Sequence, residues 1–236
     1  MQIASNKIIF MIYISENINF FIEGWGLKML IDIHMHEKKY SSDSFVSLEE
    51  IVAKAKSIGL DGICITDHES NQIKAEAAEL SAKEEFPVIV GAEVLTQAGD
   101  ILVFGLNDLP KEKIPTQDLI DLVNEAGGIA IAAHPFRDNG RGVGEKIRNL
   151  SGLAGIETFN GSTKPDHNFQ AYSLALELDL PCLGGSDTHV IERVGKFVTS
   201  FPDWVSTTKD LIKAVKNNEV MPVNYNHKEI SNREIS

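Results

Sequence analysis

The sequence predicts an α/β fold in which helices wrap a parallel sheet, and three observations carry this prediction. Short apolar stretches alternate with amphipathic helical segments along most of the chain. The chain has 236 residues, 43% of them hydrophobic, which is enough to bury the core of one barrel-sized domain. Histidines and carboxylates follow the carboxyl ends of the apolar stretches, and in a β/α barrel those ends share one rim. A doubly wound open sheet also places ligands at strand ends. A closed barrel gathers so many successive strand ends more easily, and we therefore expect a barrel.

The first half of the chain reads as strand, helix, strand, helix. An apolar strand leads to residues 31–36, where the first histidines stand. Ser47 followed by Glu50 is typical of a capping box, and apolar residues then recur at helical spacing until Ile58-Gly59. The next expected elements are strand 63–66, helix 70–84, strand 87–90 and strand 100–106.

The second half continues the alternation. Gly127-Gly128 closes a helix, and the strand after it runs into His134-Pro135. The expected elements here are helix 116–126, strand 129–133, strand 155–157, helix 167–178, strand 181–184, strand 196–200 and helix 207–216.

We expect a single domain over residues 29–225, since no repeat, low-complexity tract or linker interrupts it. Residues 1–28 are interpreted as an N-terminal extension that this domain does not need, because Met29 stands directly before the first strand. Their apolar run is too short to span a bilayer and makes a poor signal peptide. Residues 226–236 are expected to form a polar tail.

The charge balance is acidic, with a net charge of −12 and an isoelectric point near 5.0. Such a chain is a poor partner for long nucleic acid or for an anionic membrane. A small phosphorylated substrate is not excluded, because divalent cations can reverse the field in a site. Cys64 and Cys182 each lie in an apolar run and are interpreted as core residues, which suits a reducing cytoplasm.

The first strand carries an unusual pair of histidines. In an extended strand Asp32, His34 and His36 project to one face, and the apolar residues between them project to the other. Two buried imidazoles without partners would be costly, whereas two imidazoles side by side make half of a metal site. The pattern therefore favours metal binding.

Five of the seven histidines belong to one set of residues at strand ends. For any single histidine a core or surface role is the simpler interpretation, but the set as a whole indicates a metal centre. Imidazole suits zinc, manganese or iron, and carboxylates can bridge two ions. The set exceeds what one ion needs, so we expect two or three divalent ions. Its members are His34, His36, His68, Glu93, His134, Asp187 and His189.

Five motifs in this order resemble those of the PHP (polymerase and histidinol phosphatase) family, especially its short stand-alone members. The resemblance covers about residues 30–223. One such motif would be weak evidence, but five in the family's order are specific. The motifs are His34-x-His36, Thr66-Asp67-His68, Gly91-Ala92-Glu93-Val94, Ala133-His134-Pro135 and Gly185-Ser186-Asp187-Thr188-His189.

The resemblance implies a distorted (β/α)7 barrel with a trinuclear metal site that hydrolyses phosphoesters. By that resemblance the first ion would be held by His34, His36, Glu93 and Asp187. Glu93 would bridge to a second ion bound by His134, and the third ion would be held by Asp43, His68 and His189.

One position departs from the family's pattern. Members usually carry Gly-His in the strand after the Glu93 motif, whereas this chain has Gly99-Asp100. Asp100 is a candidate ligand of the second ion through oxygen, and the alternative is that its shorter side chain leaves the position to water. The substitution favours a harder metal such as manganese over zinc at that ion.

The resulting hypothesis is a metal-dependent phosphoesterase that uses ion-activated water on a small phosphate ester, for example a nucleotide or short oligonucleotide. Asp187, His189 and a metal-bound water are the three candidates for protonating the leaving group. Arg137 and Arg193 are expected to grip the phosphate, with Arg141 as a weaker candidate. The residues expected to support them are Asp32 and Asp67, as partners of ligand imidazoles, and Glu157 and Asn160, as substrate contacts.

Two other functions stay open. Amidohydrolases that cleave C–N bonds also begin with His-x-His, but their sites usually lack the bridging Glu93 pattern and the Ser-Asp-Thr-His ending. A non-catalytic metal-binding module is the third candidate. The departure at Asp100 keeps that candidate open.

Overall fold

The computed structural model describes residues 27–225. The expectations for the polar tail, and for all but the last two residues of the N-terminal extension, lie outside these residues. The first strand begins at Leu27, just before Met29. The helices are α3 (Leu48–Ser57), α4 (Lys74–Glu84), α5 (Thr116–Glu125), α6 (Pro165–Glu177) and α7 (Thr208–Lys216), with short 3-10 turns at Gly144–Asn149 and Ile191–Arg193. The strands are β1 (Leu27–Asp32), β2 (Gly62–Ile65), β3 (Val88–Val90), β4 (Ala92–Leu95), β5 (Asp100–Phe104), β6 (Ile129–Ala132), β7 (Gly155–Asn160), β8 (Cys182–Gly185), β9 (Phe197–Pro202) and β10 (Met221–Asn224).

The predicted α/β class is confirmed, but the strands form two mixed sheets and not one parallel sheet. The sheets have the orders β10-β9-β1-β2-β3 and β4-β5-β6-β7-β8. The neighbours β1-β2-β3 and β6-β7-β8 are parallel. By contrast, β5 is antiparallel to both β4 and β6, and β9 to both β1 and β10. The link between β4 and β5 is too short for a crossover, so these two strands can pair only as a hairpin.

The two sheets meet through two isolated parallel bridges beyond the strand ends. Met35 pairs with Thr188, and His68 pairs with Glu93. Within residues 27–225 the strand pairing therefore gives two five-stranded sheets linked at the rim, and a closed barrel does not follow from it. Both bridges involve residues next to or within the expected metal set, so the contact between the sheets is also where the site is built.

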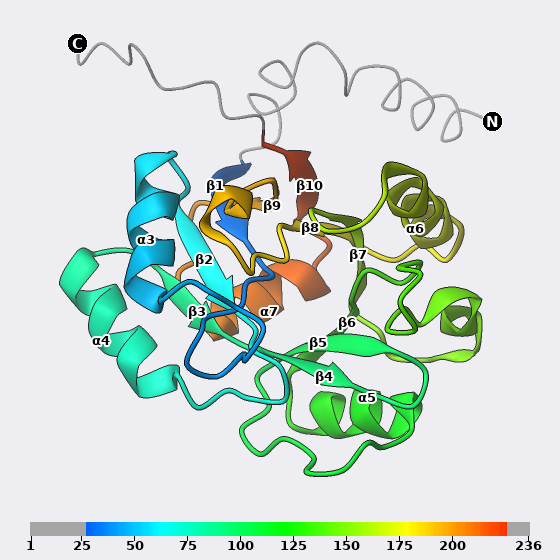
Figure 1. The fold of residues 1–236 in the computed structure, drawn as a ribbon. Coiled ribbons are helices and arrows are strands. Elements are labelled where there is room, and N and C mark those ends of the chain that lie inside the picture. Colours follow the sequence, from blue (N-terminus) through cyan, green and yellow to red (C-terminus); the bar gives the residue numbers. More distant parts are fainter. Residues whose placement is uncertain (1–26, 226–236) are drawn as a thin grey trace.

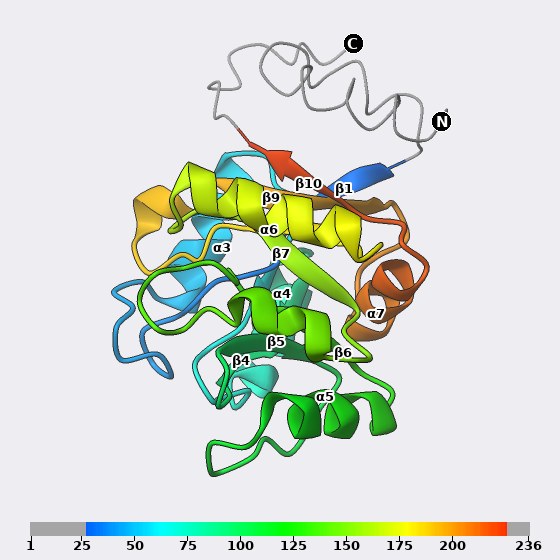
Figure 2. The ribbon, with the colours of Figure 1, turned by 90° about the vertical axis from the view of Figure 1, so that its right-hand side faces the viewer.

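The helices cover the outside of the sheets. In Figure 1, α3 and α4 lie on one side, next to β2 and β3. Figure 2 shows α6 lying along β7, with α5 below β5 and β6. One cluster of fully buried apolar side chains draws on strands of both sheets, among them Ile31, Leu102, Ile131 and Leu183. The sheets therefore share an interior, and this interior supports the rim that carries the site.

Local signals placed several helix ends correctly. Ser47 and Glu50 form the expected capping box at α3, and Thr207 caps α7 together with Asp210. The helix expected over 70–84 begins only at Lys74. The reason is that the stretch before it lies along β4: the Glu69 N–H donates to the Glu93 carbonyl at 2.9 Å.

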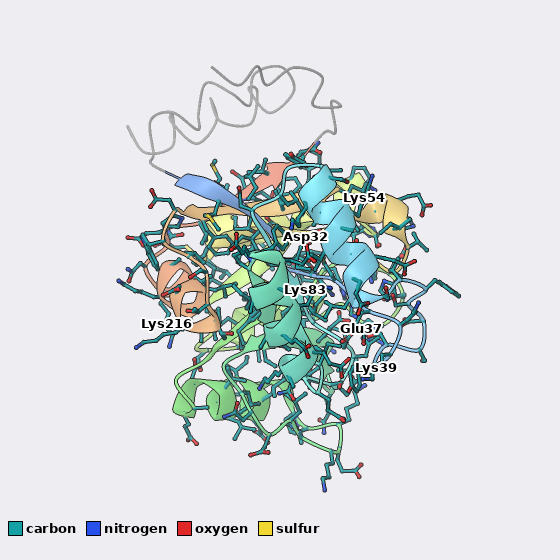
Figure 3. The ribbon with its side chains drawn as sticks, turned by 90° about the vertical axis from the view of Figure 1, so that its left-hand side faces the viewer. Asp32, Glu37, Lys39, Lys54, Lys83 and Lys216 are labelled. Atoms are coloured by element: carbon teal, nitrogen blue, oxygen red, sulfur yellow. The ribbon has the colours of Figure 1, made fainter. Side chains whose placement is uncertain are left out.

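Most charged side chains lie on the surface, and Asp32 is one of the exceptions. In Figure 3, Lys83 lies on α4, on the face turned toward the viewer, and Lys216 lies on α7; both lysines are exposed, whereas Asp32 is fully buried. Cys64 is fully buried, as expected for a core residue, and Cys182 is partly buried against the core. Over the described residues, we find no helix with the length and apolar character needed to cross a bilayer.

Candidate metal centre

The candidate ligands gather at one rim, where several strands end. His34 and His36 follow β1, His68 follows β2, and His134 follows β6. Asp187 and His189 follow β8 in the same way. Asp100 is the first residue of β5, and because β5 runs antiparallel to its neighbours, its beginning lies at this same rim.

The first pair of histidines faces two buried carboxylates. The Nε2 atoms of His34 and His36 are 3.1 Å apart. His34 Nε2 lies 3.5 Å from Glu93 Oε1 and 3.8 Å from Asp187 Oδ1. His36 Nε2 lies 3.6 Å from Glu93 Oε2 and 3.4 Å from Asp187 Oδ1. Four donor side chains from three parts of the chain thus converge on one point, as an ion would require.

Two further groups extend the site on either side of Glu93. His134 Nε2 lies 2.7 Å from Glu93 Oε1. On the other side, Asp43 Oδ2 lies 3.3 Å from the Nε2 atoms of both His68 and His189. His68 also approaches Glu93, with 2.9 Å between Nδ1 and Oε2. The tightest donor groups among the described residues are His34 with His36 and Asp187, His34 with Glu93 and His134, and His36 with His68 and His189.

The chemistry of this set fits divalent ions. Within the described part of the chain, the buried atoms with no hydrogen-bond partner include three in this set: Asp187 Oδ1, His134 Nδ1 and Asp100 Oδ1. A native protein rarely leaves such atoms unsatisfied unless an ion or water belongs there. Mixed imidazole and carboxylate donors suit zinc, manganese and iron. The residues present therefore match the group that the sequence predicts.

The electrostatics favour ionised carboxylates. Burial opposes ionisation of Glu93 and Asp187, but the neighbouring His34 holds the pKa of both well below the ordinary value. Burial likewise opposes the charge on His34, yet Glu157, Asp187 and Glu93 raise its pKa well above the ordinary value. Burial lowers the pKa of His36 to about 4, so this imidazole is neutral near pH 7. The centre thus holds two carboxylates and a neutral imidazole ready to ligate.

Glu157 orients His34, and Asp32 does not. Glu157 Oε1 lies 2.9 Å from His34 Nδ1, and its Oε2 accepts from the backbone N–H of His134 at 2.9 Å. Asp32 instead accepts from the backbone N–H groups of His34, Ser186 and Gly195. The expectation for Asp32 is therefore wrong, because its carboxylate is used by the backbone. Glu157 lies in β7, a strand that also ends at the rim, and this position is the feature of the sequence that could have indicated its role as the partner of His34.

Asp67 acts on His36 through a serine that the sequence did not single out. The Ser41 hydroxyl donates to Asp67 Oδ1 at 2.7 Å and lies 3.3 Å from His36 Nδ1. Both His34 and His36 therefore have their Nδ1 side occupied by a fixed partner. This leaves both Nε2 atoms pointing at the centre, as ligands require.

The three arginines differ in how close they come to the site. Arg137 donates to Asp187 Oδ2 and, at 2.8 Å, to Asn160 Oδ1. Arg141 donates to Asp100 Oδ2 at 2.6 Å. Arg193 donates to the hydroxyl of Ser162. That hydroxyl in turn donates to the carbonyl of Asp187, so Arg193 reaches the candidate ligands only through Ser162. Asn160, expected as a substrate contact, is fully buried and orients Arg137.

Two members of the set have strained backbones. His134 has φ of +26° and Asp187 has φ of +54°, both in the left-handed region that non-glycine residues rarely adopt. Such strain costs about 1–3 kcal/mol and persists where the surroundings hold it, most often at functional sites. The strain at these two residues is consistent with a site selected for geometry over stability.

Gly185→Ala tests how tightly the site is packed. A Cβ at this position would lie 2.6 Å from His34 Cβ and 2.7 Å from Glu157 Oε1, so this pair must shift. We expect metal affinity to fall about tenfold or more, because the shift misorients His34. Titration with Mn²⁺ would measure it. In Gly127→Ala the added methyl meets nothing within 4 Å, so this control should lose thermal stability but keep its metal affinity. Equal affinities in Gly185→Ala and the native protein would contradict the described packing.

Loading the centre with metal should release protons. The pKa of His34 and of His68 is raised, against burial, by neighbouring carboxylates such as Glu157 and Glu93. Both imidazoles are therefore mostly protonated at pH 6, and an ion must displace about two protons there. The affinity for metal should therefore rise as the pH is raised from 6 and these two imidazoles lose their protons. Calorimetric titration in two buffers of different ionisation enthalpy measures the release, and none at pH 6 would show that these histidines are not ligands.

Comparisons with known proteins point to one family. Residues 165–220 match the model of the PHP-associated domain PHP_C. The chain is 34% identical over 143 residues to the uncharacterized protein MJ1587 of Methanocaldococcus jannaschii, a match that covers 56% of this chain and 82% of that protein.

Solved structures share the fold at low sequence identity. A proposed metal-dependent phosphoesterase from Bifidobacterium adolescentis aligns with a TM-score of 0.62 at 18% identity, over 81% of this chain and 96% of its own. An amidohydrolase from Chromobacterium violaceum with bound sulfate aligns with 0.61 at 20% identity, over 81% and 97%. A lesion-specific endonuclease from Pyrococcus furiosus aligns with 0.59 at 18% identity, over 80% of this chain and 56% of its own.

The motifs, the donor geometry and these matches agree. The match to MJ1587 spans most of that protein, and the family model covers residues 165–220, which include the last motif, Gly185–His189. The chain belongs to the PHP (polymerase and histidinol phosphatase) family.

Proposed function

We propose that the protein is a metal-dependent phosphoesterase that hydrolyses a small phosphate ester. The observation that carries the proposal is the convergence of five histidines on Glu93 and Asp187, with an arginine donating directly to Asp187. The neighbour from Bifidobacterium adolescentis, a proposed metal-dependent phosphoesterase, supports the same class of activity.

The chain's own residues suit this chemistry. When bound, divalent ions would supply Lewis acidity and an activated water. His34, His36, Glu93 and Asp187 would hold the first ion. His68, His189 and Asp43 would hold another, and Glu93 would share an ion with His134. We propose manganese, zinc or iron as the metal, with two or three ions per chain.

Arg137 is positioned to hold the phosphate. Its guanidinium is partly buried beside Asp187, and Asn160 fixes its orientation. Guanidinium matches phosphoryl oxygens bidentately and neutralises the charge that grows on them. For the leaving group, Asp187 is a poor proton donor because its pKa lies well below the ordinary value. His189, the other side-chain candidate, is 24% exposed, but its Nε2 faces Asp43 as a ligand. Only its Nδ1, which lies 3.2 Å from the carbonyl oxygen of Asp187, could carry a proton.

An exposed aromatic side chain at the rim suits a nucleotide. Phe45 is 76% exposed, and its backbone N–H donates to the carbonyl of His189 at 3.0 Å. We expect Phe45→Ala to raise KM several-fold for nucleotides but not for inorganic pyrophosphate or a small alkyl phosphate, because stacking on a base is worth about 1–3 kcal/mol. Steady-state kinetics would measure this. Phe169, which is 49% exposed and lies on α6, gives a control in Phe169→Ala. An equal rise in KM for all substrates would contradict the stacking role.

The alternative of C–N hydrolysis is favoured by one neighbour, the amidohydrolase of Chromobacterium violaceum. Two arginines beside the ligands favour an anionic substrate over a neutral amide, since a guanidinium binds phosphoryl oxygens through paired hydrogen bonds. We therefore place this alternative second.

A substrate screen tests the proposal. Protein loaded with Mn²⁺, Zn²⁺ or Fe²⁺ would be assayed on an aryl phosphate, an aryl phosphodiester, nucleotides, short oligonucleotides and N-acyl amides. We expect turnover of a phosphate ester that a chelator abolishes and added metal restores. Turnover of amides alone would favour the C–N hydrolase. Stoichiometric metal without any turnover would favour a non-catalytic module.

We also propose that the strands form a distorted seven-stranded barrel in the functional protein. The two parallel bridges at the rim support this, because each continues the direction of the strands before it. A cytoplasmic location, suggested by the cysteine content, stays a prediction.

A further inference from the structure

We propose that Asp100 is the counterion of Arg141 and not a metal ligand, so that the centre holds two tightly bound ions and uses the Arg141 guanidinium as a fixed third cation. This inference rests on the proposed metal centre. It concerns the position where this sequence departs from the pattern of its family.

The guanidinium of Arg141 lies among donors that an ion would otherwise use. Its Nε donates to Asp100 Oδ2 at 2.6 Å. Its Nη2 lies 3.2 Å from His68 Nδ1 and 3.7 Å from Glu93 Oε2. One cation thus faces three candidate ligands: His68, which follows β2, Glu93 in β4 and Asp100 in β5. An ion bound to the same oxygen of Asp100 would lie close to this positive charge and be repelled by it.

Asp100 is poorly placed as a ligand through Oδ2, the oxygen that Arg141 occupies. Its other oxygen, Oδ1, is buried with no hydrogen-bond partner, and a bound water would satisfy it without a third ion. Asp100 is fully buried, and its Oδ2 is 3.9 Å from His134 Nε2, further than the 2.7 Å that separates Glu93 Oε1 from the same nitrogen. None of the tight donor groups within residues 27–225 includes Asp100.

Counting donors leads to two ions. Each Nε2 can bind one ion at a time, so His34, committed with His36 and Asp187 to the first ion, is not available to another. The third position has His68, His189 and Asp43. With Asp100 engaged by Arg141, the second position retains only Glu93 and His134. Catalytic metal sites commonly have three protein ligands, so two make a weak site.

The backbone is built to bring Arg141 to this place. The Asp100 N–H donates to the carbonyl of Arg141 at 2.8 Å. The preceding residue, Gly99, has φ of +155°, and a Cβ there would lie 2.6 Å from both Arg141 O and Val143 N. A side chain at Gly99 would therefore push this loop away. Main-chain and side-chain contacts together hold Arg141 against Asp100.

Arg141 can also supply the positive charge that an ion in the second position would provide. Its side chain is 31% exposed, so solvent or a substrate can reach part of it. A guanidinium within reach of a substrate can bind a phosphoryl oxygen that an ion in the second position would have bound. The pairing thus keeps positive charge at this position without a third metal.

Metal counting tests the inference without any need for turnover. The protein and its variants would be loaded with excess Mn²⁺, desalted and analysed for bound metal by mass spectrometry. We expect two equivalents in the native protein. Arg141→Met keeps an unbranched apolar stem at this position but removes the charge and releases Asp100, so we expect three equivalents. Arg141→Lys keeps a cation and should stay at two.

Asp100→Asn is a second test that does not depend on whether Arg141→Met folds. Asp100→Asn should still hold two equivalents if Asp100 is no ligand, with circular dichroism confirming the fold. Three equivalents in the native protein, a loss of metal in Asp100→Asn, or two equivalents in folded Arg141→Met would each overturn the inference. Failure of the substrate screen with two ions bound would sink the proposed function and leave this inference standing.

Discussion

Asp187→Asn is expected to lower kcat for a phosphate ester about a thousandfold, which corresponds to about 4 kcal/mol of transition-state stabilisation. Asp187 Oδ1 faces His34 and His36 at 3.8 and 3.4 Å, and Oδ2 receives Arg137. An amide in its place would give the first ion one anionic ligand fewer and would leave Arg137 without its counterion. Steady-state kinetics with saturating Mn²⁺, together with metal analysis, would measure both losses.

Asp138→Asn is the matched control for this prediction. Asp138 lies on the loop next to Arg137, is 61% exposed and pairs with Lys164, so its replacement should leave kcat within about twofold of the native value. If Asp187→Ala or Asp187→Asn retained native turnover, the assignment of this carboxylate to the reaction would be wrong.

Glu157→Gln is expected to weaken metal binding about 10- to 100-fold although Glu157 touches no ion. Its Oε2 accepts from two donors, the backbone N–H of His134 and Asn160 Nδ2. A glutamine would keep its oxygen with these donors and turn its NH₂ toward His34 Nδ1. That nitrogen must then accept, so the proton moves to Nε2, the atom that faces Glu93 and Asp187.

The expected signature of Glu157→Gln is a folded protein with less bound metal and a slower reaction that high metal concentrations partly restore. Mn²⁺ titration with thermal denaturation of the metal-free protein would separate the effect on ligation from the effect on stability. Glu145→Gln removes an exposed carboxylate that pairs with Arg148 and should change neither. Unchanged affinity in Glu157→Gln would mean that His34 does not need this carboxylate to orient it.

Sequence patterns placed most helices and strands because those signals act over short distances. The capping box at Ser47 and the apolar spacing of α3 involve residues within a few positions of one another. The start of α4 was placed too early because the preceding residues pair with β4, a contact between segments distant in sequence. The direction of β5 was missed for a similar reason: periodicity shows that a strand exists but not which way it runs beside its neighbours.

The sequence by itself determined the family, the α/β class and the identity of the candidate ligands, since each motif is local and directly follows an apolar strand. Tertiary structure decided which side chains support those ligands. Glu157 meets His34 across 123 positions of the chain, and Arg141 meets His68 across 73. Such pairs depend on how the strands are ordered and on which direction each one runs. No pattern in a single segment carries that information, so the partners of the histidines, and the pairing of Asp100 with Arg141, emerge only when the two sheets meet at the rim.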